Sequence, residues 1–360
     1  MILCNVHSLA VTMLLLGKFF PPSGRDENTS LTPALPSTTT PTAIPMAFQE
    51  EITVMSWNIL APCYVLPHLH RSRKFADDFD SVTEYMDWSY RRPRIIERIT
   101  RESADIVCLQ EVQLDLWVYL RDELKERGYT ASIVQKVNRG LRVTTVILVH
   151  DRRQYQWKVT KVESRSRVLL VTLECQPSTS CGTSSNSKNT EPYFIFLGNV
   201  HLSAGRKEFV TRYQQVKSML QRLVLHTQRS SPPQLDEPFV LLMGDWNTLS
   251  TDPLHHLITT GTLPEDHGLP QLYPNLPLLP LHDINQSQEQ KQSNGLNWTH
   301  TCGEILDYIF ASSSVRVVSV WSTNHGTNLP IPSADFPSDH VPIGGKLQLS
   351  RINQRQRSGH

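Results

Sequence analysis

One apolar stretch constrains the fold more than any other, because it ends abruptly in small polar residues. Residues 239–243 are all apolar, and Gly244, Asp245 and Asn247 come directly after them or close behind. A strand that is apolar along its whole length is typical of a sheet covered on both faces. Asp245 and Asn247 project to the same side if the chain stays extended. Turns also favour Gly, Asp and Asn, so this stretch alone fits either a turn or a site.

Composition places the chain among globular proteins. Its 360 residues are 39% hydrophobic and 19% charged, which suffices for a large core without a division into two domains. The formal net charge of +1 means that contact with nucleic acid would need a local basic patch. The six cysteines form no CxxC pair and no zinc-like spacing. This favours a reduced, cytoplasmic chain, with organelle targeting by residues 1–48 as the alternative.

The N-terminal segment differs in composition from the rest of the chain. Residues 8–20 are mostly apolar, but the run is too short to span a membrane and lacks preceding basic residues. Residues 21–46 are rich in Pro, Thr and Ser and cannot bury enough apolar surface to become ordered. We predict a targeting segment or disordered tail at 1–48, one folded domain at 49–350, a disordered tail at 351–360, and no transmembrane span.

After residue 50, strand and helix patterns alternate. Residues 52–60 and 104–112 predict two buried strands that end in polar residues. The pattern over 85–101 predicts a helix between them, with Ser89 as its N-cap and Pro93 in its first turn. The basic residues expected on the solvated outer face of this helix are Arg91, Arg92, Arg94, Arg98 and Arg101. Strand, helix and strand in this order indicate α/β layering.

The alternation continues along the chain. A helix over 114–127 ends at Gly128, a residue that commonly stops helices. Three β-branched or aromatic runs predict strands at 143–149, 168–173 and 193–199. Another helix is expected over 206–228. The stretches 176–192 and 263–295 are expected to be loops, and the second is long enough to face a substrate.

Polar groups capable of chemistry stand at the ends of these apolar segments or within them. They are Asn58, Glu111, His201, Asp245, Asn247, Asp307, Asp339 and His340. Taken singly, each one fits an ordinary turn or a satisfied structural residue. Six separate apolar segments that each supply such a group favour a shared site.

The residue types in this set favour metal-assisted hydrolysis of a phosphate ester. The set contains no nucleophilic Ser or Cys with a base, and it lacks zinc-like spacing. Oxygen ligands from Glu111, with Asp339 or Asp245, suit Mg²⁺, with Mn²⁺ as the alternative. His and Asn donors suit the charge that develops on phosphate oxygens. Asp307, which lies in an apolar segment, would orient the imidazole of His340 and raise its pKa.

Six motifs resemble, in their order along the chain, those of the endonuclease/exonuclease/phosphatase superfamily. They are Ser56-Trp57-Asn58, Leu109-Gln110-Glu111-Val112, Val200-His201-Leu202, Gly244-Asp245-Trp246-Asn247, Leu306-Asp307-Tyr308 and Ser338-Asp339-His340. Members range from deoxyribonuclease I and abasic-site endonucleases to sphingomyelinases and inositol phosphatases. Residues 58–61, 85–92 and 336–340 further resemble the carbon-catabolite-repressor deadenylase, nocturnin and Angel branch. The resemblance covers about 50–350.

This resemblance implies a fold and a metal site. The fold is a four-layer α/β sandwich like that of deoxyribonuclease I, with two central mixed β-sheets flanked by helices and the site at their strand ends. Residues 49–350 would then be the catalytic domain. Glu111 is implied as the principal Mg²⁺ ligand, with Asn58 and Asp339 near the metal.

The resemblance also implies catalytic roles. Asp245 would orient or deprotonate the attacking water, and Asn247 would hold the phosphate. His201 and His340 would stabilise the charge of the pentacovalent transition state, with Asp307 supporting His340.

One departure bears on the substrate. Deadenylases of this branch carry a base-stacking aromatic residue a few positions before the equivalent of Asp307, where this chain has residues 301–304, Thr-Cys-Gly-Glu. The missing ring weakens the case for poly(A), since stacking contributes about 1–3 kcal/mol per base.

We therefore predict a Mg²⁺-dependent phosphoesterase that acts on single-stranded RNA or a nucleotide. The favoured reaction is deadenylase-like removal of nucleotides from RNA 3′ ends, with proteins of mRNA decay as partners. The first alternative is a nucleotide or RNA-end phosphatase of the nocturnin or Angel type. The second is a catalytically inactive RNA-binding scaffold, against which the intact Glu111, Asp245, Asn247 and His340 argue.

Overall fold

The structure is a computed structural model of the chain. It describes residues 46–65, 84–138, 140–152, 155–177, 192–230, 238–264, 280–286, 298–321 and 331–352. The tails predicted at 1–48 and 351–360 lie outside the described residues, apart from their inner ends. The same holds for most of the loops predicted at 176–192 and 263–295. Among the described residues, no helix is both long enough and apolar enough to cross a membrane.

Two six-stranded mixed sheets form the centre of the described structure. The first has the order β11 (Val315–Val320), β12 (Ile343–Ile352), β1 (Met46–Asn58), β2 (Ile106–Gln113), β4 (Val143–Val149) and β3 (Ala131–Val134). The second has the order β5 (Tyr155–Ser164), β6 (Val168–Pro177), β7 (Tyr193–His201), β8 (Phe239–Asp245), β10 (Asp307–Ala311) and β9 (His282–Asp283).

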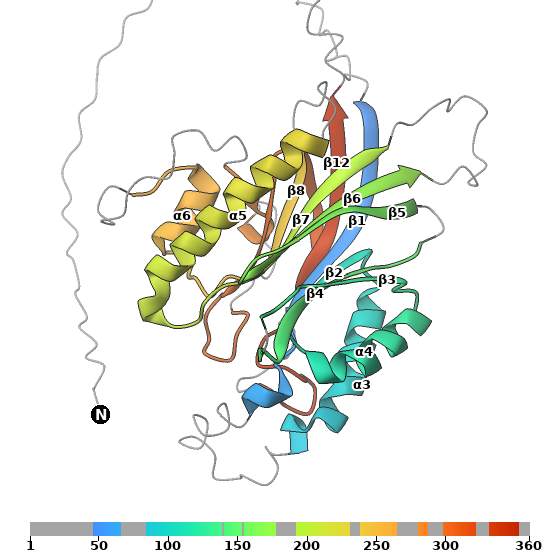
Figure 1. Cartoon of the computed structure of the whole chain (residues 1–360), viewed down its shortest axis with the longest axis vertical. Helices are drawn as coiled ribbons and strands as arrows, with labels where there is room; N and C mark the ends of the chain where they lie inside the picture. Colours follow the sequence, from blue (N-terminus) through green and yellow to red (C-terminus); the bar gives the residue numbers. More distant parts are fainter. Residues whose placement is uncertain are drawn as a thin grey trace, which may run out of the picture. The chain divides into compact units, whose positions relative to one another are not determined.

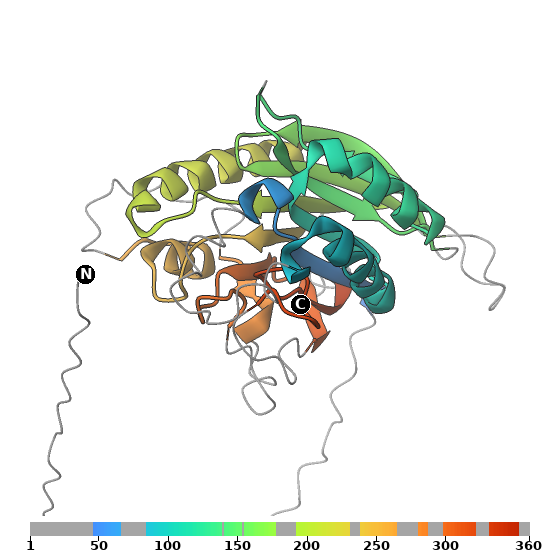
Figure 2. The ribbon, with the colours of Figure 1, turned by 90° about the horizontal axis from the view of Figure 1, so that it is seen from below.

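Helices cover the outer face of each sheet (Figure 1, Figure 2). The first sheet carries α3 (Trp88–Glu102) and α4 (Leu114–Glu126). The second carries α5 (Phe209–Ser230), which follows the short helix η1 (Arg206–Glu208), and α6 (Pro253–Thr260). A further short helix, η3 (Ile284–Gln286), follows β9. This arrangement confirms the predicted four-layer α/β sandwich.

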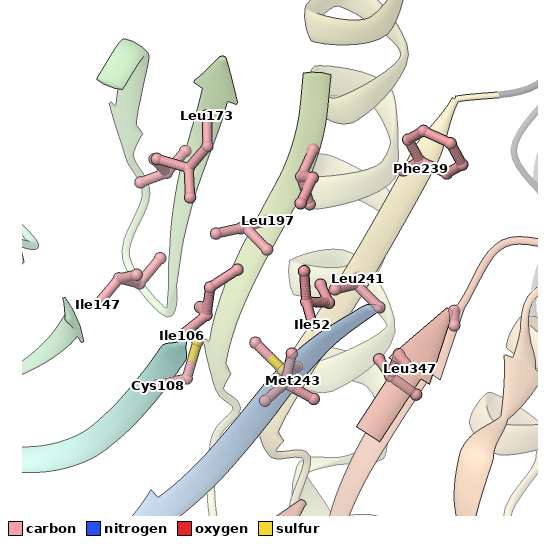
Figure 3. Packing of buried hydrophobic residues seen from close by; sticks show 14 of the residues in the cluster. Ile52, Ile106, Cys108, Ile147, Leu173, Leu197, Phe239, Leu241, Met243 and Leu347 are labelled. Carbon is pink, nitrogen blue, oxygen red and sulfur yellow. The ribbon is translucent and has the colours of Figure 1, made fainter. Parts of the chain in front are cut away.

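The main core lies between the two sheets (Figure 3). Side chains alternate across a strand, so Ile52 and Val54 of β1 face the second sheet while Met55 and Trp57 face the helices. In the second sheet, Met243 belongs to the same inter-sheet cluster. The central strands read as unbroken apolar runs because both of their faces are covered.

Each sheet contains one parallel strand pair, and a helix connects the two strands of each pair. In the first sheet β1 and β2 run parallel, and the last residue of β1, Asn58, lies opposite Gln110. In the second sheet β7 and β8 run parallel, with His201 opposite Asp245. Both crossovers therefore deliver polar residues at the carboxyl ends of parallel strands, where open α/β sheets commonly bind ligands.

Several sequence-based boundaries differ from the structure. Strand β1 begins at Met46 and β12 ends at Ile352, so the strands extend beyond the predicted limits of 49 and 350. Strand β10 begins at Asp307, which therefore opens the strand rather than lying within it. The sequence analysis missed β3, β5, β9, β11 and α6. Strand β5 lies at the edge of its sheet, where half-exposed, polar positions weaken an apolar pattern.

The start of α3 was also predicted wrongly. Asp87, not Ser89, is the N-cap, and its carboxylate accepts a hydrogen bond from the backbone N–H of Ser89 at 2.7 Å. The helix begins at Trp88, so Pro93 lies inside it rather than in its first turn. Arg91 does not belong to a basic outer face, because its side chain is completely buried.

The buried guanidinium of Arg91 joins three backbone segments. It donates to the carbonyls of Met86 at 3.2 Å, Ile59 and Pro337 at 3.0 Å, and Leu60 at 2.9 Å. These segments follow β1, precede α3 and precede β12. The bonds therefore fix the two loops that carry polar residues at the ends of the first sheet.

We expect Arg91→Met to lower the free energy of unfolding by at least about 3 kcal/mol, because it leaves several buried carbonyls unpaired at about 1–3 kcal/mol each. Arg92 is a matched control, since it forms a half-exposed ion pair with Glu123 at 3.3 Å. Arg92→Met should cost no more than about 1 kcal/mol. Urea unfolding of the three proteins gives the comparison. Equal losses for the two variants would contradict the bridging role of Arg91.

Candidate active site

Asn58 connects the candidate residues of the two sheets. Its Nδ2 donates to Glu111 Oε1 at 3.2 Å and to Asp245 Oδ2 at 3.1 Å. Its Oδ1 accepts from the backbone N–H of Leu60 at 3.0 Å, which fixes the orientation of the amide. Asn58 is fully buried. One amide therefore orients a carboxylate from each sheet.

Glu111 reaches this point because β2 bulges there. Gln110 and Glu111 together lie opposite Thr145, since the register with β4 shifts between Leu109 and Val112. Glu111 has a φ of 56°, a left-handed conformation that is uncommon for a residue other than glycine. Its Oε2 accepts from the backbone N–H of Ala61 at 3.1 Å. The bulge turns the carboxylate toward the site.

The end of β8 and the turn after it shape the part of the site that belongs to the second sheet. Gly244 has a φ of 151°, and a Cβ there would lie 1.9 Å from the carbonyl oxygen of Val200, so only glycine fits. Asp245 Oδ1 accepts from the backbone N–H of Asn247 at 2.9 Å, and Asn247 Nδ2 donates to the Leu202 carbonyl at 3.1 Å. Both side chains are thereby fixed beside His201.

The two candidate histidines face the same carboxylate oxygen. His201 Nε2 lies 3.8 Å from Asp245 Oδ2, and His340 Nε2 lies 3.7 Å from it. His201 Nε2 is also 3.7 Å from Glu111 Oε1. His340 Nδ1 is paired with Asp307 Oδ2 at 2.8 Å, as the sequence analysis expected.

Their surroundings drive the two imidazoles toward different protonation states. Burial, followed by the charges of Arg167 and His340, lowers the pKa of His201 to about 3. Burial also disfavours the charged form of His340, but the carboxylates of Asp307 and Asp245 outweigh it and raise the pKa of His340 well above its usual value. The site thus combines a neutral imidazole with a protonated one.

Two buried carboxylates of the site have pKa values above their usual range. Burial and the nearby Asp339 raise the pKa of Glu111 to about 7, and burial raises the pKa of Asp245 to about 6. Among the described residues, the ion-pair partners of Glu111 and Asp245 are histidines and include no lysine or arginine. Buried negative charge is costly without a cation. A carboxylate-rich set of oxygen donors fits a hard divalent cation such as Mg²⁺ or Mn²⁺.

Asp339 joins the cluster from the segment before β12. Ser338 Oγ donates to the Asn58 carbonyl at 2.7 Å and lies 3.4 Å from Asp339 Oδ1. Trp57 Nε1 donates to the His340 carbonyl at 2.8 Å. These contacts hold the 338–340 segment against the end of β1, so all eight predicted residues belong to one site.

The sequence analysis missed two residues beside this site. His300 Nε2 lies 3.7 Å from Asp339 Oδ2, and the hydroxyl of Thr299 accepts from the backbone N–H groups of Leu306 and Asp307 at 2.9 and 3.2 Å. Neither residue follows an apolar run, so the strand-end pattern could not single them out. Their place in the site follows from long-range pairing with the 339–341 segment.

A family comparison matches residues 55–340 with the endonuclease/exonuclease/phosphatase family. The chain belongs to this family. The match confirms the predicted resemblance, and enzymes of the family depend on a divalent metal ion.

Curated relatives lie in the expected branch. Carbon catabolite repressor protein 4 homolog 4 of Arabidopsis thaliana is 22% identical over 343 residues, which span 83% of this chain and 78% of the relative. The CCR4-Not complex 3′-5′-exoribonuclease subunit Ccr4 of Candida glabrata is 22% identical over 359 residues, 86% of this chain but 38% of the relative. Protein angel homolog 2 of Mus musculus is 26% identical over 223 residues, 59% of this chain and 38% of the relative.

Solved structures share the fold. The crystal structure of ANGEL2, a 2′,3′-cyclic phosphatase, in complex with adenosine-2′,3′-vanadate has a TM-score of 0.63 at 18% identity and covers 85% of this chain and 97% of that chain. The human nocturnin catalytic domain with bound sulfate has a TM-score of 0.54 at 18% identity and covers 84% and 95%. At this identity the likeness establishes the architecture alone.

The Asp307–His340 pair gives a prediction for activity. We expect Asp307→Asn to lower kcat at least about 10²-fold, a typical cost of disabling a positioned acid–base group. A raised pKa keeps His340 protonated to high pH. Removing the Asp307 charge lowers that pKa, so the alkaline limb of the pH–rate profile should move to lower pH. An unchanged profile and rate would contradict the assignment.

Asp283 supplies the control for this substitution, since it pairs with the buried His255 at 3.5 Å between α6 and β9. Asp283→Asn should leave both kcat and the pH profile unchanged.

Proposed function

We propose that this protein is a Mg²⁺-dependent phosphoesterase that removes nucleotides from the 3′ end of single-stranded RNA. The observation that carries the proposal is the convergence of Glu111 from one sheet and Asp245 from the other on the Asn58 amide. Two histidines in opposite protonation states flank the same point. This combination suits attack of water on a phosphate, because it offers oxygen ligands, a proton acceptor and a cationic donor together.

The metal would be held by Glu111 and Asp339, with Asn58 orienting the first of them. When bound, Mg²⁺ stabilises negative charge on phosphate oxygens and lowers the pKa of water. It would also add positive charge beside Glu111, whose burial disfavours its ionised form. The choice of Mg²⁺ over Mn²⁺ belongs to the proposal.

Side chains of the site would complete the reaction. Asp245 has a pKa near 6, so its carboxylate is ionised at neutral pH yet basic enough to take a proton from the attacking water. The protonated His340 would donate a hydrogen bond to a developing oxyanion, and Asp307 keeps it charged. The neutral His201 would donate to a second phosphate oxygen, and Asn247 would hold the phosphate through its amide.

The choice of substrate is argued from the curated relatives and from the residues that precede Asp307. The Arabidopsis and Candida relatives are carbon-catabolite-repressor proteins, and the Candida one is a 3′-5′ exoribonuclease of the CCR4-Not complex. We extend that activity, and contact with mRNA-decay proteins, to this chain as proposals. Residues 301–304 carry no aromatic side chain that could stack on an adenine, and Cys302 among them is exposed. This argues against a strong preference for adenine. Trp298 packs against the apolar cluster of Ile331, Phe336 and Val341.

A second candidate is phosphatase activity on an RNA end or a nucleotide. The fold likeness to ANGEL2 and the absence of an aromatic residue at 301–304 both favour it. The deciding experiment incubates the purified chain and Mg²⁺ with poly(A), mixed RNA, RNA ending in a 2′,3′-cyclic phosphate, and NADP⁺, and resolves the products by mass. Mononucleotide release supports the exonuclease. Loss of phosphate alone, or opening of the cyclic phosphate, supports the second candidate. No product from any substrate contradicts both.

Glu111→Gln tests the metal site. It keeps the side-chain volume but removes one anionic ligand, so we expect activity to fall more than about 100-fold, beyond the loss typical of outer-shell partners. Glu163→Gln is the control, because Glu163 on β5 pairs with His226 on α5 at 3.1 Å. Initial rates across a Mg²⁺ titration provide the measurement. Near-normal turnover of Glu111→Gln at saturating Mg²⁺ would refute the assignment.

Cys302→Phe tests the substrate preference. Because Cys302 is exposed, a ring there has room, and the clash expected for a packed residue does not arise. We expect little preference for poly(A) in the unmodified protein and a gain of up to roughly 1–3 kcal/mol in the variant. Initial rates on poly(A), poly(U) and mixed RNA, with melting temperatures alongside, give the comparison. Strong poly(A) preference in the unmodified protein would contradict this prediction.

A further inference from the structure

His300 is held beside the site by backbone pairing. The N–H of Thr301 donates to the Asp339 carbonyl at 2.8 Å, and the N–H of Val341 donates to the Thr299 carbonyl at 2.8 Å. These bonds form an antiparallel bridge that sets His300 opposite His340. The position of His300 relative to Asp339 therefore depends on main-chain geometry.

A second backbone group fixes which ring nitrogen faces Asp339. The N–H of Cys302 donates to His300 Nδ1 at 3.1 Å, which requires a lone pair on that nitrogen. The proton of the neutral ring then sits on Nε2, 3.7 Å from Asp339 Oδ2. His300 therefore presents an N–H to Asp339.

We propose that His300 is a positioning residue whose Nε2–H orients the carboxylate of Asp339 toward the divalent cation. The inference rests on the proposed function, in which Asp339 is a metal ligand. Carboxylates that bind metals are commonly held by outer-shell donors, whose loss weakens the metal site. At 3.7 Å the Nε2–H faces Asp339 Oδ2 beyond direct hydrogen-bond distance, so it acts on the carboxylate as a dipole. The ring of His340, 4.6 Å away between centroids, limits how far His300 can turn.

A zinc site is the competing interpretation. His300, Asp339 and His340 bring three donor atoms within 4.8 Å of one another, and two histidines with one carboxylate are a composition that binds zinc. Zinc would need a lone pair on the His300 nitrogen that faces Asp339. The Cys302 N–H occupies the other nitrogen's lone pair, so the facing nitrogen carries a proton. The geometry therefore suits a donor to Asp339.

Two substitutions distinguish the effect of the Nε2–H from the effect of the ring's volume. His300→Phe keeps a ring against His340 but removes both nitrogens, whereas His300→Gln keeps an N–H donor. His256→Phe is the matched control, since His256 is exposed on α6. The full-length proteins are titrated with Mn²⁺ and the free ion is measured by electron paramagnetic resonance. Kinetics at varied Mg²⁺ and RNA concentrations, and melting temperatures, accompany the titration.

We expect His300→Phe to weaken Mn²⁺ binding about 10–100-fold, while His300→Gln stays within about threefold of the unmodified protein. The Mg²⁺ concentration for half-maximal rate should rise in parallel, while KM for RNA at saturating Mg²⁺ and the melting temperature stay unchanged. The control variant should match the unmodified protein throughout.

Three results would overturn the proposal. The first is normal Mn²⁺ binding by His300→Phe. The second is equal weakening by the Phe and Gln variants, which would assign the effect to packing. The third is a change confined to KM for RNA, which would put His300 against the substrate. If His300→Phe alone weakens Mn²⁺ binding but no protein hydrolyses any phosphate ester, the proposed function fails and the positioning role stands.

Discussion

The rest of the site depends on how negative charge is buried where the two sheets meet. The Asn58 amide bridges Glu111 of the first sheet and Asp245 of the second, so these two strand ends must lie side by side. Hydrogen bonds between the sheets, inside the core, fix this alignment. Gln110 Nε2 donates to Asn199 Oδ1 at 2.8 Å, and Asn199 donates in turn to the Leu109 carbonyl of the first sheet at 2.9 Å. Because buried amides are costly when unpaired, these bonds favour one alignment of the sheets.

The positive charge of Arg91 acts on the carboxylates of Asp339 and Glu111. Burial lowers the pKa of Arg91 to about 10, while Asp339 and Glu111 act in the opposite direction. Arg91 bonds only to backbone carbonyls among the described residues, so it supports the site's loops and leaves the carboxylates available for a cation. The charge of Arg91 acts on Glu111 through space, whereas the carboxylate of Glu111 would bind the metal directly.

His201 and His340 differ in protonation state because their surroundings differ. His340 has Asp307 within 2.8 Å and stays charged. The carboxylates paired with His201 in the described part of the chain lie 3.7 and 3.8 Å away, beyond hydrogen-bond distance, and His201 stays neutral. Both present Nε2 to Asp245. In the proposed reaction, an anionic transition state would be met by one full charge and one dipole, with a proton acceptor between them.

The sequence by itself determined the layered α/β fold and pointed to eight polar residues that the structure brings together. Each of these lies at an end of an apolar run or interrupts one, and a buried strand must present its next polar residue where the backbone leaves the core. Tertiary structure alone decided the bulge that aims Glu111, the burial of Arg91 and the place of His300. The reason is physical: periodicity reports which face of a segment is covered, but not which distant backbone covers it. Arg91 looks solvated until the loops at Ile59 and Pro337 close over it. His300 lies beside the site only because its segment pairs, through an isolated β-bridge, with the segment that carries Asp339.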